Sequence, residues 1–561
     1  MIKGRIQAQN RDTANLQDYS KTVKYFSWDQ IGNELGISSG FNAYEYIVSA
    51  KLKSGLAQHI ALIFTSGEES TSYSFEDIHK EATNWAGLFS SIGLKIGDRI
   101  IILAYPSCEI YMALLGAIRL GLVVCPLDPK LQTAELIFKY ENARPSAIVT
   151  SPDLAENLKV LDLTSIKGVV YTKEPLKGIT EREFLFDRSF QTDEIYNVSK
   201  DSPLYLMYTS GSTGPPKGIV HTHESILSYY VTGKYVLDLK PNDCIWTDGP
   251  LSWVTGLVYG LFTPLLFGVT SIIPTRSLES HRCYWIIERE KVSVWYTTPM
   301  RLRKLKEDGL DLSRRYDLSS LRHICTVGDV LGPDLFYWTK QAFGIYPHDT
   351  WWMTETGSIV IANFPSTDLK PGSMGKAVPG IQVHVLDERF NSLPPMSLGE
   401  LAIKTPWPSM LKEVFGAPER LREYLKAPGY FLTGDLVVMD DEGYFYHQGR
   451  LDDVIKVGER MIGPYEVEET LLGHPMVSEV AVISKKAKEQ GKFLKAFVTL
   501  KKGYHESLAL SHELKAFAKA KLGLELPLNE IEFVNDLPKS NSGKILKMPL
   551  KAKELGIPLW T

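Results

Sequence analysis

Between Gly97 and Ser151 the chain alternates short apolar runs with longer segments of helical pattern. The apolar runs RIIILA, LVVCPLD and SAIVTS predict buried strands, and the segments SCEIYMALLGAIRLG and TAELIFKYENA predict helices. This alternation is typical of βαβ units, in which parallel strands are covered by helices. We therefore expect an α/β fold built on parallel-rich sheets.

The 561 residues exceed what one hydrophobic core usually organises. After Arg450 the pattern changes, because EVAVIS, FLKAFVTL and EIEFV predict short strands and LALSHELKAFAKAKLG predicts an amphipathic helix. Leu510, Leu514 and Phe517 are expected on one face of that helix. We predict a large domain over residues 1–450 and a small α+β domain over residues 451–561.

The formal net charge of -4 and the lack of a long Lys/Arg run argue against a nucleic-acid partner. The N-terminal segment MIKGRIQAQNRDTANLQDYSK has no apolar core that could act as a signal peptide. Scattered cysteines without CxxC spacing predict buried, reduced thiols rather than a metal site or disulfides; they are Cys108, Cys125, Cys244, Cys283 and Cys325. We expect a cytoplasmic protein.

The segment from Leu251 to Thr275 carries no charge and is long enough to cross a bilayer. Three glycines and a proline divide it into a helix-like GLVYGLFTPLLFG and a strand-like VTSIIP. We interpret it as a buried helix followed by a buried strand, and we expect no membrane span.

The strongest local motif is YTSGSTGPPKG, which follows the strand-like PLYLMY. Glycines let the backbone approach an anion, hydroxyl groups donate hydrogen bonds and a lysine adds a full charge. The motif therefore predicts a phosphate-binding loop, with a flexible Gly/Ser linker as the alternative. It is not the P-loop pattern, because GxxxxGK followed by Ser or Thr is absent. The loop residues are Thr209, Ser210, Gly211, Ser212, Thr213, Gly214 and Lys217.

This motif resembles the phosphate-loop signature of the adenylate-forming superfamily of acyl-CoA synthetases, peptide-synthetase adenylation domains and luciferases. DTWWMTETG at Asp349, YFLTGD at Tyr430, GRLDDVIK at Gly449 and LPKSNSGKIL at Leu537 follow in the order of that superfamily. The resemblance implies a large N-terminal domain of parallel-rich sheets with a smaller β-barrel-like part, and a mobile α+β C-terminal domain. It also implies ATP, Mg²⁺ and coenzyme A.

The resemblance assigns three residues to the chemistry. Joining a carboxylate to the α-phosphate of ATP brings two anions together, so the site must supply positive charge. Lys544 matches the catalytic lysine of the superfamily, where a point charge serves both anions, and a surface lysine is the alternative. Glu355 resembles the Mg²⁺-associated glutamate, with a helix-capping carboxylate as the alternative. Thr209 joins them as a catalytic candidate.

Further positions are expected to bind ATP or AMP. Asp435 matches the aspartate that accepts hydrogen bonds from the ribose hydroxyls, and a turn-forming Asp is the alternative. Arg450 resembles a nucleotide-contacting position, and Asp452 resembles the hinge about which the small domain turns. A surface ion pair is the alternative for Arg450 and Asp452. The other nucleotide candidates are Gly328, Asp329, Val330, Asp349, Thr350, Trp351, Thr354 and Arg460.

The chain departs from the superfamily pattern at three places. The adenine-facing loop is usually GEP, whereas this chain has Gly328, Asp329 and Val330. The segment KVGER from Lys456, which contains the coenzyme A candidate Gly458, is one residue shorter than usual. Lys519 stands where an arginine near the coenzyme A phosphates is common, so charge is kept and the fork geometry is lost. The sequence therefore supports the adenylation half-reaction better than the transfer of the acyl group to coenzyme A.

Four residues are expected to form the acyl pocket: Val254, Thr255, Val327 and Trp352. The sequence DTWWMTETG most resembles the acetyl-CoA synthetase branch, in which the second Trp closes the pocket. An indole in the tunnel leaves room for few carbons, because overfilling a packed pocket is costly. Trp352 therefore favours a short acid, and a core Trp without a selective role is the alternative.

We expect an AMP-forming acyl-CoA synthetase that converts acetate, ATP and coenzyme A to acetyl-CoA, AMP and pyrophosphate. The alternative is a ligase for propionate or another short, medium or branched acid. Two weaker hypotheses are an adenylation domain for amino acids and a non-catalytic nucleotide-binding relative. The sequence leaves the physiological direction and the oligomeric state open.

Overall fold

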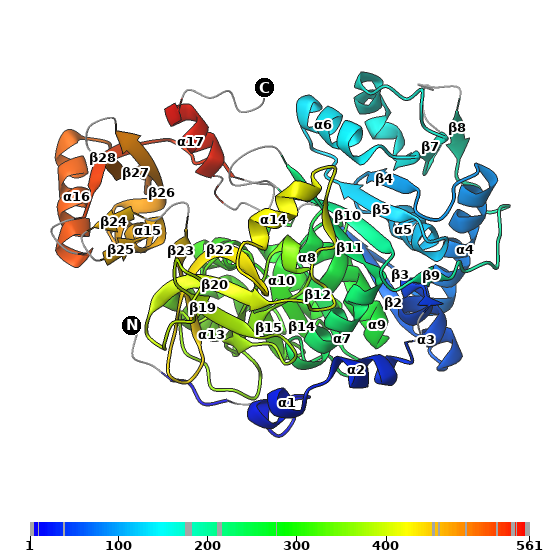
Figure 1. Ribbon diagram of the computed structural model, residues 1–561, viewed down its shortest axis with the longest axis horizontal. Coiled ribbons are helices and arrows are strands. Elements are labelled where there is room, and N and C mark those ends of the chain that lie inside the picture. Colours follow the sequence, from blue (N-terminus) through cyan, green and yellow to red (C-terminus); the bar gives the residue numbers. More distant parts are fainter. Residues whose placement is uncertain are drawn as a thin grey trace. The chain divides into compact units, whose positions relative to one another are not determined.

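The computed structural model divides into two compact units. The first contains Pro216–Gln382 and Lys404–Tyr424 with most of the chain before them, and the second contains Val383–Ile403 and the chain from Leu425 onward (Figure 1). The structure describes residues 5–8, 11–37, 40–173, 182–209, 216–276, 278–451, 455–457, 460–487, 491–522, 526–539, 545 and 547–555.

An eight-stranded sheet of the first unit contains the βαβ segment that the sequence predicts. Strands β4 to β8 and β10 pair in parallel, and β10, β11 and β21 pair antiparallel. The strands, in spatial order, are β21 (Glu413–Phe415), β11 (Lys217–Thr222), β10 (Pro203–Thr209), β5 (Val123–Leu127), β4 (Arg99–Leu103), β6 (Ala147–Thr150), β7 (Gly168–Tyr171) and β8 (Glu183–Leu185).

A nine-stranded sheet forms the other half of the first unit. Its six central strands are parallel, and antiparallel strands close both edges. The order is β18 (Lys376–Ala377), β17 (Ile361–Ala362), β16 (Pro347–Trp351), β15 (His323–Thr326), β14 (Val294–Thr297), β12 (Cys244–Thr247), β13 (Thr270–Pro274), β2 (Ile60–Ser66) and β3 (Glu69–Ser74). Parallel strands place their carboxyl ends at one edge, which is where α/β proteins commonly bind ligands.

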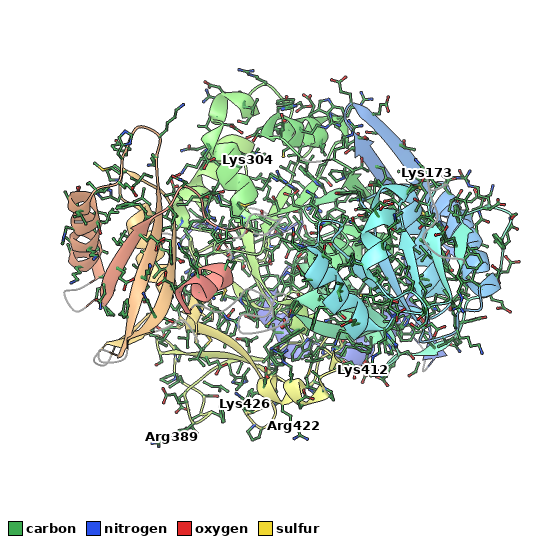
Figure 2. All side chains as sticks on the ribbon, turned by 90° about the horizontal axis from the view of Figure 1, so that it is seen from above. Lys173, Lys304, Arg389, Lys412, Arg422 and Lys426 are labelled. Atoms are coloured by element: carbon green, nitrogen blue, oxygen red, sulfur yellow. The ribbon has the colours of Figure 1, made fainter. Side chains whose placement is uncertain are left out.

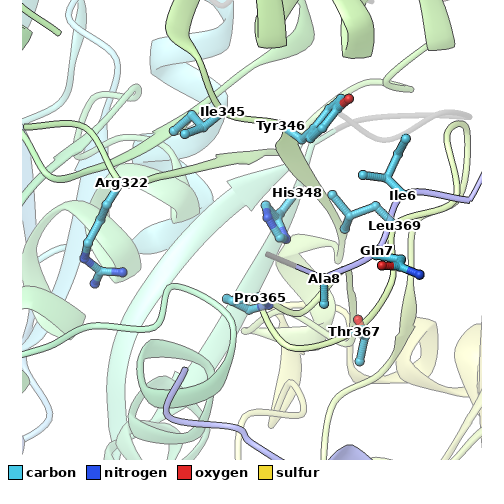
Figure 3. Close-up of a pocket in the computed structure, with 10 residues that line it drawn as sticks. All are labelled: Ile6, Gln7, Ala8, Arg322, Ile345, Tyr346, His348, Pro365, Thr367 and Leu369. Carbon is cyan, nitrogen blue, oxygen red and sulfur yellow. The ribbon is translucent and has the colours of Figure 1, made fainter. Parts of the chain in front are cut away.

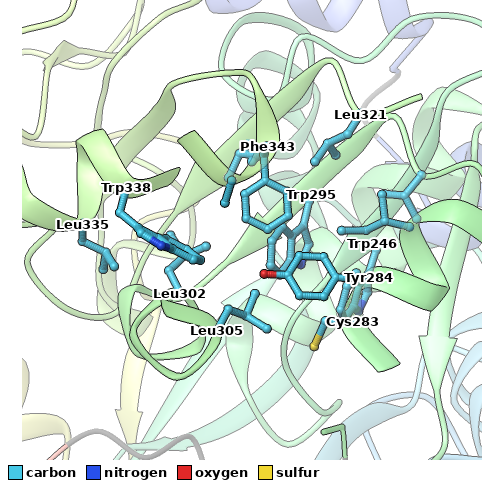
Figure 4. Close-up of a cluster of buried hydrophobic side chains, with 14 of the residues drawn as sticks. Trp246, Cys283, Tyr284, Trp295, Leu302, Leu305, Leu321, Leu335, Trp338 and Phe343 are labelled. Carbon is cyan, nitrogen blue, oxygen red and sulfur yellow. The ribbon is translucent and has the colours of Figure 1, made fainter. Parts of the chain in front are cut away.

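Helices supply the apolar side chains that cover both sheets. The ring of Trp246 on β12 stacks on that of Trp295 on β14 with their centroids 5.1 Å apart, and Tyr284 and Phe343 complete this core (Figure 4). Burial of such aromatic side chains contributes about 1.5–3 kcal/mol each. The longer helices of this unit are α4 (Phe75–Ser91), α5 (Cys108–Arg119), α6 (Thr133–Ala143), α7 (Ile226–Tyr235), α10 (Ser280–Arg289), α11 (Pro299–Glu307) and α13 (Pro333–Phe343).

The N-terminal segment packs on the nine-stranded half. The backbone of Ile6 pairs with that of Leu369, and Asp368 accepts hydrogen bonds from Arg5 and Arg11. A small cavity lies between this segment and β16, with His348 and Arg322 among its lining residues (Figure 3). Helices α1 (Tyr19–Tyr25), α2 (Trp28–Leu35) and α3 (Ala50–Lys53), with the π-helical turn η1 (Glu45–Ser49), follow it.

The second unit holds two larger sheets. A four-stranded sheet, β19 (Val383–Leu386), β20 (Leu398–Lys404), β22 (Tyr430–Met439) and β23 (Phe445–Arg450), is the smaller β part implied by the family resemblance. It groups with the C-terminal segment, which differs from the division at residue 450 expected from the sequence. The position of the hinge stays a prediction.

The C-terminal segment has the expected α+β pattern. Leu510 and Leu514 are buried in its core, and the Phe517 ring packs edge-on against His474. The elements are β24 (Ile455–Val457), β25 (Arg460–Ile462), α15 (Pro464–Leu472), β26 (Val477–Ala487), β27 (Gly491–Leu500), α16 (Leu508–Leu522), β28 (Leu528–Phe533) and α17 (Lys547–Leu555).

The uncharged segment is a buried helix and strand, as predicted. Helical turns run without a break through α8 (Val254–Leu257), the π-helical turn η4 (Val258–Phe262) and α9 (Thr263–Phe267), and β13 follows. Across the residues that the structure describes, no helix is long and apolar enough to cross a membrane. All five cysteines are free thiols. Lys173 and Lys304 are exposed and lie in separate parts of the first unit (Figure 2).

Candidate active site

The predicted phosphate loop connects two antiparallel strands. Thr209 ends β10, Lys217 begins β11, and the two residues are paired across the hairpin. The pairing holds both ends of the connection together, so Thr209 and Lys217 stand at the base of the loop. Residues 210–215, which include Ser210, Gly211, Ser212, Thr213 and Gly214, lie outside the described residues.

A tyrosine links the lysine of this hairpin to the predicted metal-associated glutamate. The Lys217 Nζ donates to the Tyr424 hydroxyl at 2.9 Å, and that hydroxyl donates to Oε1 of Glu355 at 3.0 Å. Glu355 and Tyr424 are buried, at 7% and 8% exposure. Burial, followed by the Glu355 charge, raises the pKa of Tyr424, so this hydroxyl stays protonated. Glu355 therefore accepts a hydrogen bond from the neutral Tyr424 hydroxyl, and that hydroxyl accepts one from the Lys217 ammonium group.

The turn that carries Glu355 is fixed from several sides. His221 on β11 donates from Nε2 to the Thr354 carbonyl at 2.7 Å, and burial lowers its pKa to about 4, which keeps it neutral. Gly357 has φ +73°. A Cβ there would lie 2.2 Å from the Ser409 carbonyl oxygen, so the glycine of TETG is required by both conformation and space. The turn, η5 (Thr354–Thr356), therefore lies against the hairpin strand β11.

A magnesium ion fits the donor chemistry of this region. Glu355 supplies a hard oxygen ligand, and Mg²⁺ is commonly held by one or two carboxylates together with substrate phosphates and water. Among the residues that the structure describes, no group of three or more His, Cys, Asp or Glu side chains could hold a metal. Glu355 would be the protein ligand of such an ion, beside the phosphates and water that Mg²⁺ commonly keeps.

The Asp349 carboxylate lies inside the sheet. The Thr326 hydroxyl donates to its Oδ1 at 2.7 Å, and burial raises its pKa to about 7. The neighbouring Thr350 donates to the Thr326 carbonyl at 2.7 Å. Asp349, Thr350 and Trp351 all belong to β16, so these three nucleotide candidates lie at the carboxyl end of one strand.

The loop with the unusual sequence Gly328-Asp329-Val330 follows β15. Gly328 has φ +96°, a conformation that favours glycine. The Asp329 carboxylate pairs with Arg303 at 2.8 Å on the surface, and its Oδ1 accepts the backbone N–H of Val330. A charged pair therefore occupies the place where most superfamily members have GEP.

The expected acyl-pocket residues come from three places in the first unit. Val254 and Thr255 begin the helical segment 254–267, and Val327 directly follows β15. Trp352 directly follows β16 and is 8% exposed. Its indole N–H donates to the Tyr296 hydroxyl at 2.9 Å, and the Tyr259 ring packs edge-on against it with the centroids 5.2 Å apart. Two tyrosines thus contact the indole.

The ribose candidate Asp435 lies in the four-stranded sheet of the second unit. Arg450 on the paired strand donates to its Oδ1 at 2.7 Å, and the His447 Nε2 lies 3.6 Å from its Oδ2. Asp435 is 6% exposed. Arg450 and Asp435, the two nucleotide candidates on this sheet, therefore form an ion pair with each other.

The remaining candidates fall in the C-terminal segment. Lys544, the hinge residue Asp452 and the coenzyme A candidate Gly458 lie outside the described residues. Arg460 begins β25 and its backbone pairs with Val457 of β24, so the shortened segment belongs to a hairpin. Lys519 lies on α16 and is half-buried.

Three residues that sequence reasoning missed belong to this region: Tyr424, Tyr296 and Tyr259. No motif surrounds them, and their partners are remote in sequence. Tyr259 and Tyr296 stand in apolar segments that are typical of core packing, and Tyr424 stands in the charged segment RLREYLK, so no local signal identifies these hydroxyls or rings as partners of Glu355 or Trp352.

The fold is of the α/β class, and the carboxyl ends of its parallel strands lie where such proteins commonly bind ligands. The family described as AMP-binding enzyme matches residues 53–412, and the family described as AMP-binding enzyme C-terminal domain matches residues 466–544. The chain belongs to this family of AMP-binding enzymes, as its motifs predict.

The chain is also similar over nearly its whole length to individual proteins. It is 38% identical to the acetyl-coenzyme A synthetase of Bacillus subtilis (strain 168), over 97% of this chain and 96% of that protein. It is 32% identical to the acetyl-coenzyme A synthetase of Methanothrix soehngenii, over 96% and 84%. The structure of an anthranilate CoA ligase in complex with anthranoyl-AMP is 26% identical, with a TM-score of 0.81 over 94% and 99%. The expected class, an AMP-forming acyl-CoA synthetase, is confirmed.

Proposed function

We propose that this protein joins acetate to AMP and then transfers the acetyl group to coenzyme A. In the first step a carboxylate oxygen attacks the α-phosphorus of ATP, and the bond to the pyrophosphate oxygen breaks. In the second step the coenzyme A thiolate attacks the acyl carbon, and AMP leaves. Propionate is the next candidate, because a methylene in an apolar pocket changes selectivity by only about 1–3 kcal/mol.

The observation that carries the choice of a short acid is the anchored indole of Trp352. Its N–H is bonded to Tyr296 and its ring lies against Tyr259, so it cannot turn aside to admit a longer chain without breaking a buried hydrogen bond. Similarity to acetyl-coenzyme A synthetases of two organisms supports the same acid.

Adenylation needs positive charge beside the phosphates and a fixed position for the acid. In this proposal Lys217 contacts the phosphates from the hairpin, and Glu355 would hold Mg²⁺, which would supply positive charge beside the leaving pyrophosphate. Lys544 serves the carboxylate and the α-phosphate, and Asp435 binds the ribose. The family resemblance supports the last two roles.

Two supporting proposals concern the setting of the reaction. Coenzyme A reaches the acyl adenylate after the small domain turns about Asp452, with Gly458 and Lys519 near it. The five free cysteines fit a reducing compartment, so we place the reaction in the cytoplasm.

ATP–pyrophosphate exchange with acetate, propionate, butyrate, hexanoate and benzoate tests the first half-reaction. We expect the highest kcat/KM for acetate, with propionate second. A preference for hexanoate or benzoate would contradict the short-acid proposal. Formation of acetyl-CoA from acetate, ATP and coenzyme A by the purified enzyme tests the second half, and exchange without thioester formation would limit the protein to activation.

A further inference from the structure

Three side chains and one carbonyl form a directed chain of hydrogen bonds that begins at the expected acyl-pocket residue Trp352. The Trp352 N–H donates to the Tyr296 hydroxyl at 2.9 Å, which lies 2.8 Å from the Thr350 hydroxyl. Thr350 donates to the Thr326 carbonyl at 2.7 Å. Because the Thr350 proton is used there, the Tyr296 proton must point to Thr350, and the Tyr296 oxygen accepts from the indole.

This chain of donors is fully enclosed. Tyr296 and Thr326 are 0% exposed, and Thr350 is 4% exposed. A hydrogen-bond chain of one direction strengthens its members, and a buried donor without an acceptor is costly. The arrangement therefore resists any displacement of the indole, and Tyr296 is its central member.

A second tyrosine, Tyr259, also constrains the indole, and its ring packs edge-on against both Trp352 and Tyr296. Tyr259 lies on the π-helical turn η4, and such turns often occur at functional sites. Hydroxyls from neighbouring strands bind carbonyls of this turn, because Thr247 donates to Tyr259 O at 2.9 Å and Ser271 to Gly260 O at 2.7 Å. The Tyr259 hydroxyl itself contacts Thr232 and the Ile359 N–H, not the indole nitrogen.

We propose that Tyr296 determines acyl-chain specificity by holding the Trp352 indole across the end of the acyl pocket. It is a positioning residue, since it acts through Trp352, and the inference rests on the proposed function. Without the Tyr296 hydroxyl, the indole N–H loses its hydrogen-bond acceptor. The indole can then move, and the pocket admits longer acids.

The test is a double-mutant cycle on chain-length selectivity with Tyr296→Phe and Trp352→Phe. The readout is the ratio of kcat/KM for butyrate to that for acetate. We expect Tyr296→Phe to raise this ratio about tenfold in the native background, the lower end of what one methylene is worth in such a pocket. In the Trp352→Phe background it should leave the ratio unchanged, because phenylalanine has no N–H to donate. An equal effect in both backgrounds, or none in the first, would overturn the proposal.

Tyr259→Phe is the matched control. It removes an equally buried hydroxyl from a ring that packs on the same indole, but that hydroxyl does not touch the indole nitrogen. It should lower the thermal midpoint and leave the selectivity ratio unchanged. A selectivity change as large as that of Tyr296→Phe would mean that Tyr296 acts only through general packing, and not through its hydrogen bond to the indole.

A second readout separates this inference from the proposed function. The native protein, the two single variants and the double variant also give a thermal-unfolding cycle. In it, Tyr296→Phe should lower the unfolding midpoint more in the native background than in the Trp352→Phe background. If no acid supports pyrophosphate exchange, the proposed function fails while this coupling stands. If acetate is activated and neither cycle shows coupling, only the role of Tyr296 fails.

Discussion

The hydroxyl of Tyr424 donates to the carboxylate of Glu355 over 3.0 Å, although 69 residues separate them in the chain. The same hydroxyl accepts from Lys217, and the ammonium group also lies 4.7 Å from the centroid of the Tyr424 ring. One tyrosine thus orients both charged groups that we assign to the phosphates and Mg²⁺.

Tyr424→Phe should lower kcat/KM for MgATP about 10- to 100-fold, because a hydrogen bond to a charged group contributes about 1.5–3 kcal/mol. The ratio between acids should not change, since the acyl pocket is untouched. ATP–pyrophosphate exchange over a range of Mg²⁺ concentrations measures both quantities. Tyr337→Phe, at a tyrosine that is 39% exposed on α13, is the control. Native activity of Tyr424→Phe would show that Glu355 needs no such partner.

Lys544→Ala should abolish adenylation while ATP binding persists, because the lysine is assigned to the reacting carboxylate and α-phosphate rather than to nucleotide affinity. Exchange kinetics and equilibrium dialysis of ATP separate the two effects. Lys553→Ala on α17, which removes an exposed ion pair with Glu532, should behave like the native protein. Normal exchange in the Lys544 variant would remove the proposed role.

Trp352→Gly should extend the range of acids beyond butyrate and weaken acetate activation. Deleting a large buried side chain leaves a cavity, so stability should fall by about 3–5 kcal/mol. A panel of straight-chain acids in the exchange assay shows the new optimum. An unchanged preference for acetate would identify Trp352 as a core residue without a selective role.

Asp435→Ala should raise the Kd for ATP about tenfold, because the ribose loses an acceptor and Arg450 loses its 2.7 Å partner. Isothermal titration with ATP gives the affinity directly. Asp441→Ala, at an exposed position between β22 and β23, is the matched control. Equal affinity in both variants would leave Asp435 with a structural role only.

Asp349→Asn should gain stability relative to the native protein as pH rises. Burial raises the pKa of Asp349 from 3.8 to about 7, so the folded protein holds a proton that the unfolded chain has released above about pH 4. The stability of the native protein linked to this group is therefore greatest below about pH 4 and is lost as pH rises through about 7. Asparagine does not ionise and avoids that loss.

Urea unfolding of both proteins between about pH 5 and pH 8 measures this difference. It should grow up to about pH 7 and then level off, at an amplitude on the order of a few kcal/mol. A difference that is independent of pH would mean that Asp349 stays ionised in the fold.

Sequence reasoning located the strands and helices that surround the site with small boundary errors. The predicted run RIIILA became β4, and the uncharged segment became a helix and a strand, because periodicity and glycine placement act locally. The sequence was less informative about how the chain divides into compact units. The four-stranded sheet groups with the C-terminal segment, and that grouping depends on contacts between remote segments.

The sequence by itself determined the family and the chemistry assigned to the motifs, because phosphate loops, acidic metal ligands and lysines keep their residue types and local order. It also located Trp352 beside Glu355 in one motif. Only the tertiary structure decided what holds these groups. Tyr296 meets Trp352 across 56 residues, and Tyr424 meets Glu355 across 69. Such pairs depend on which strands lie side by side, and no local pattern encodes them.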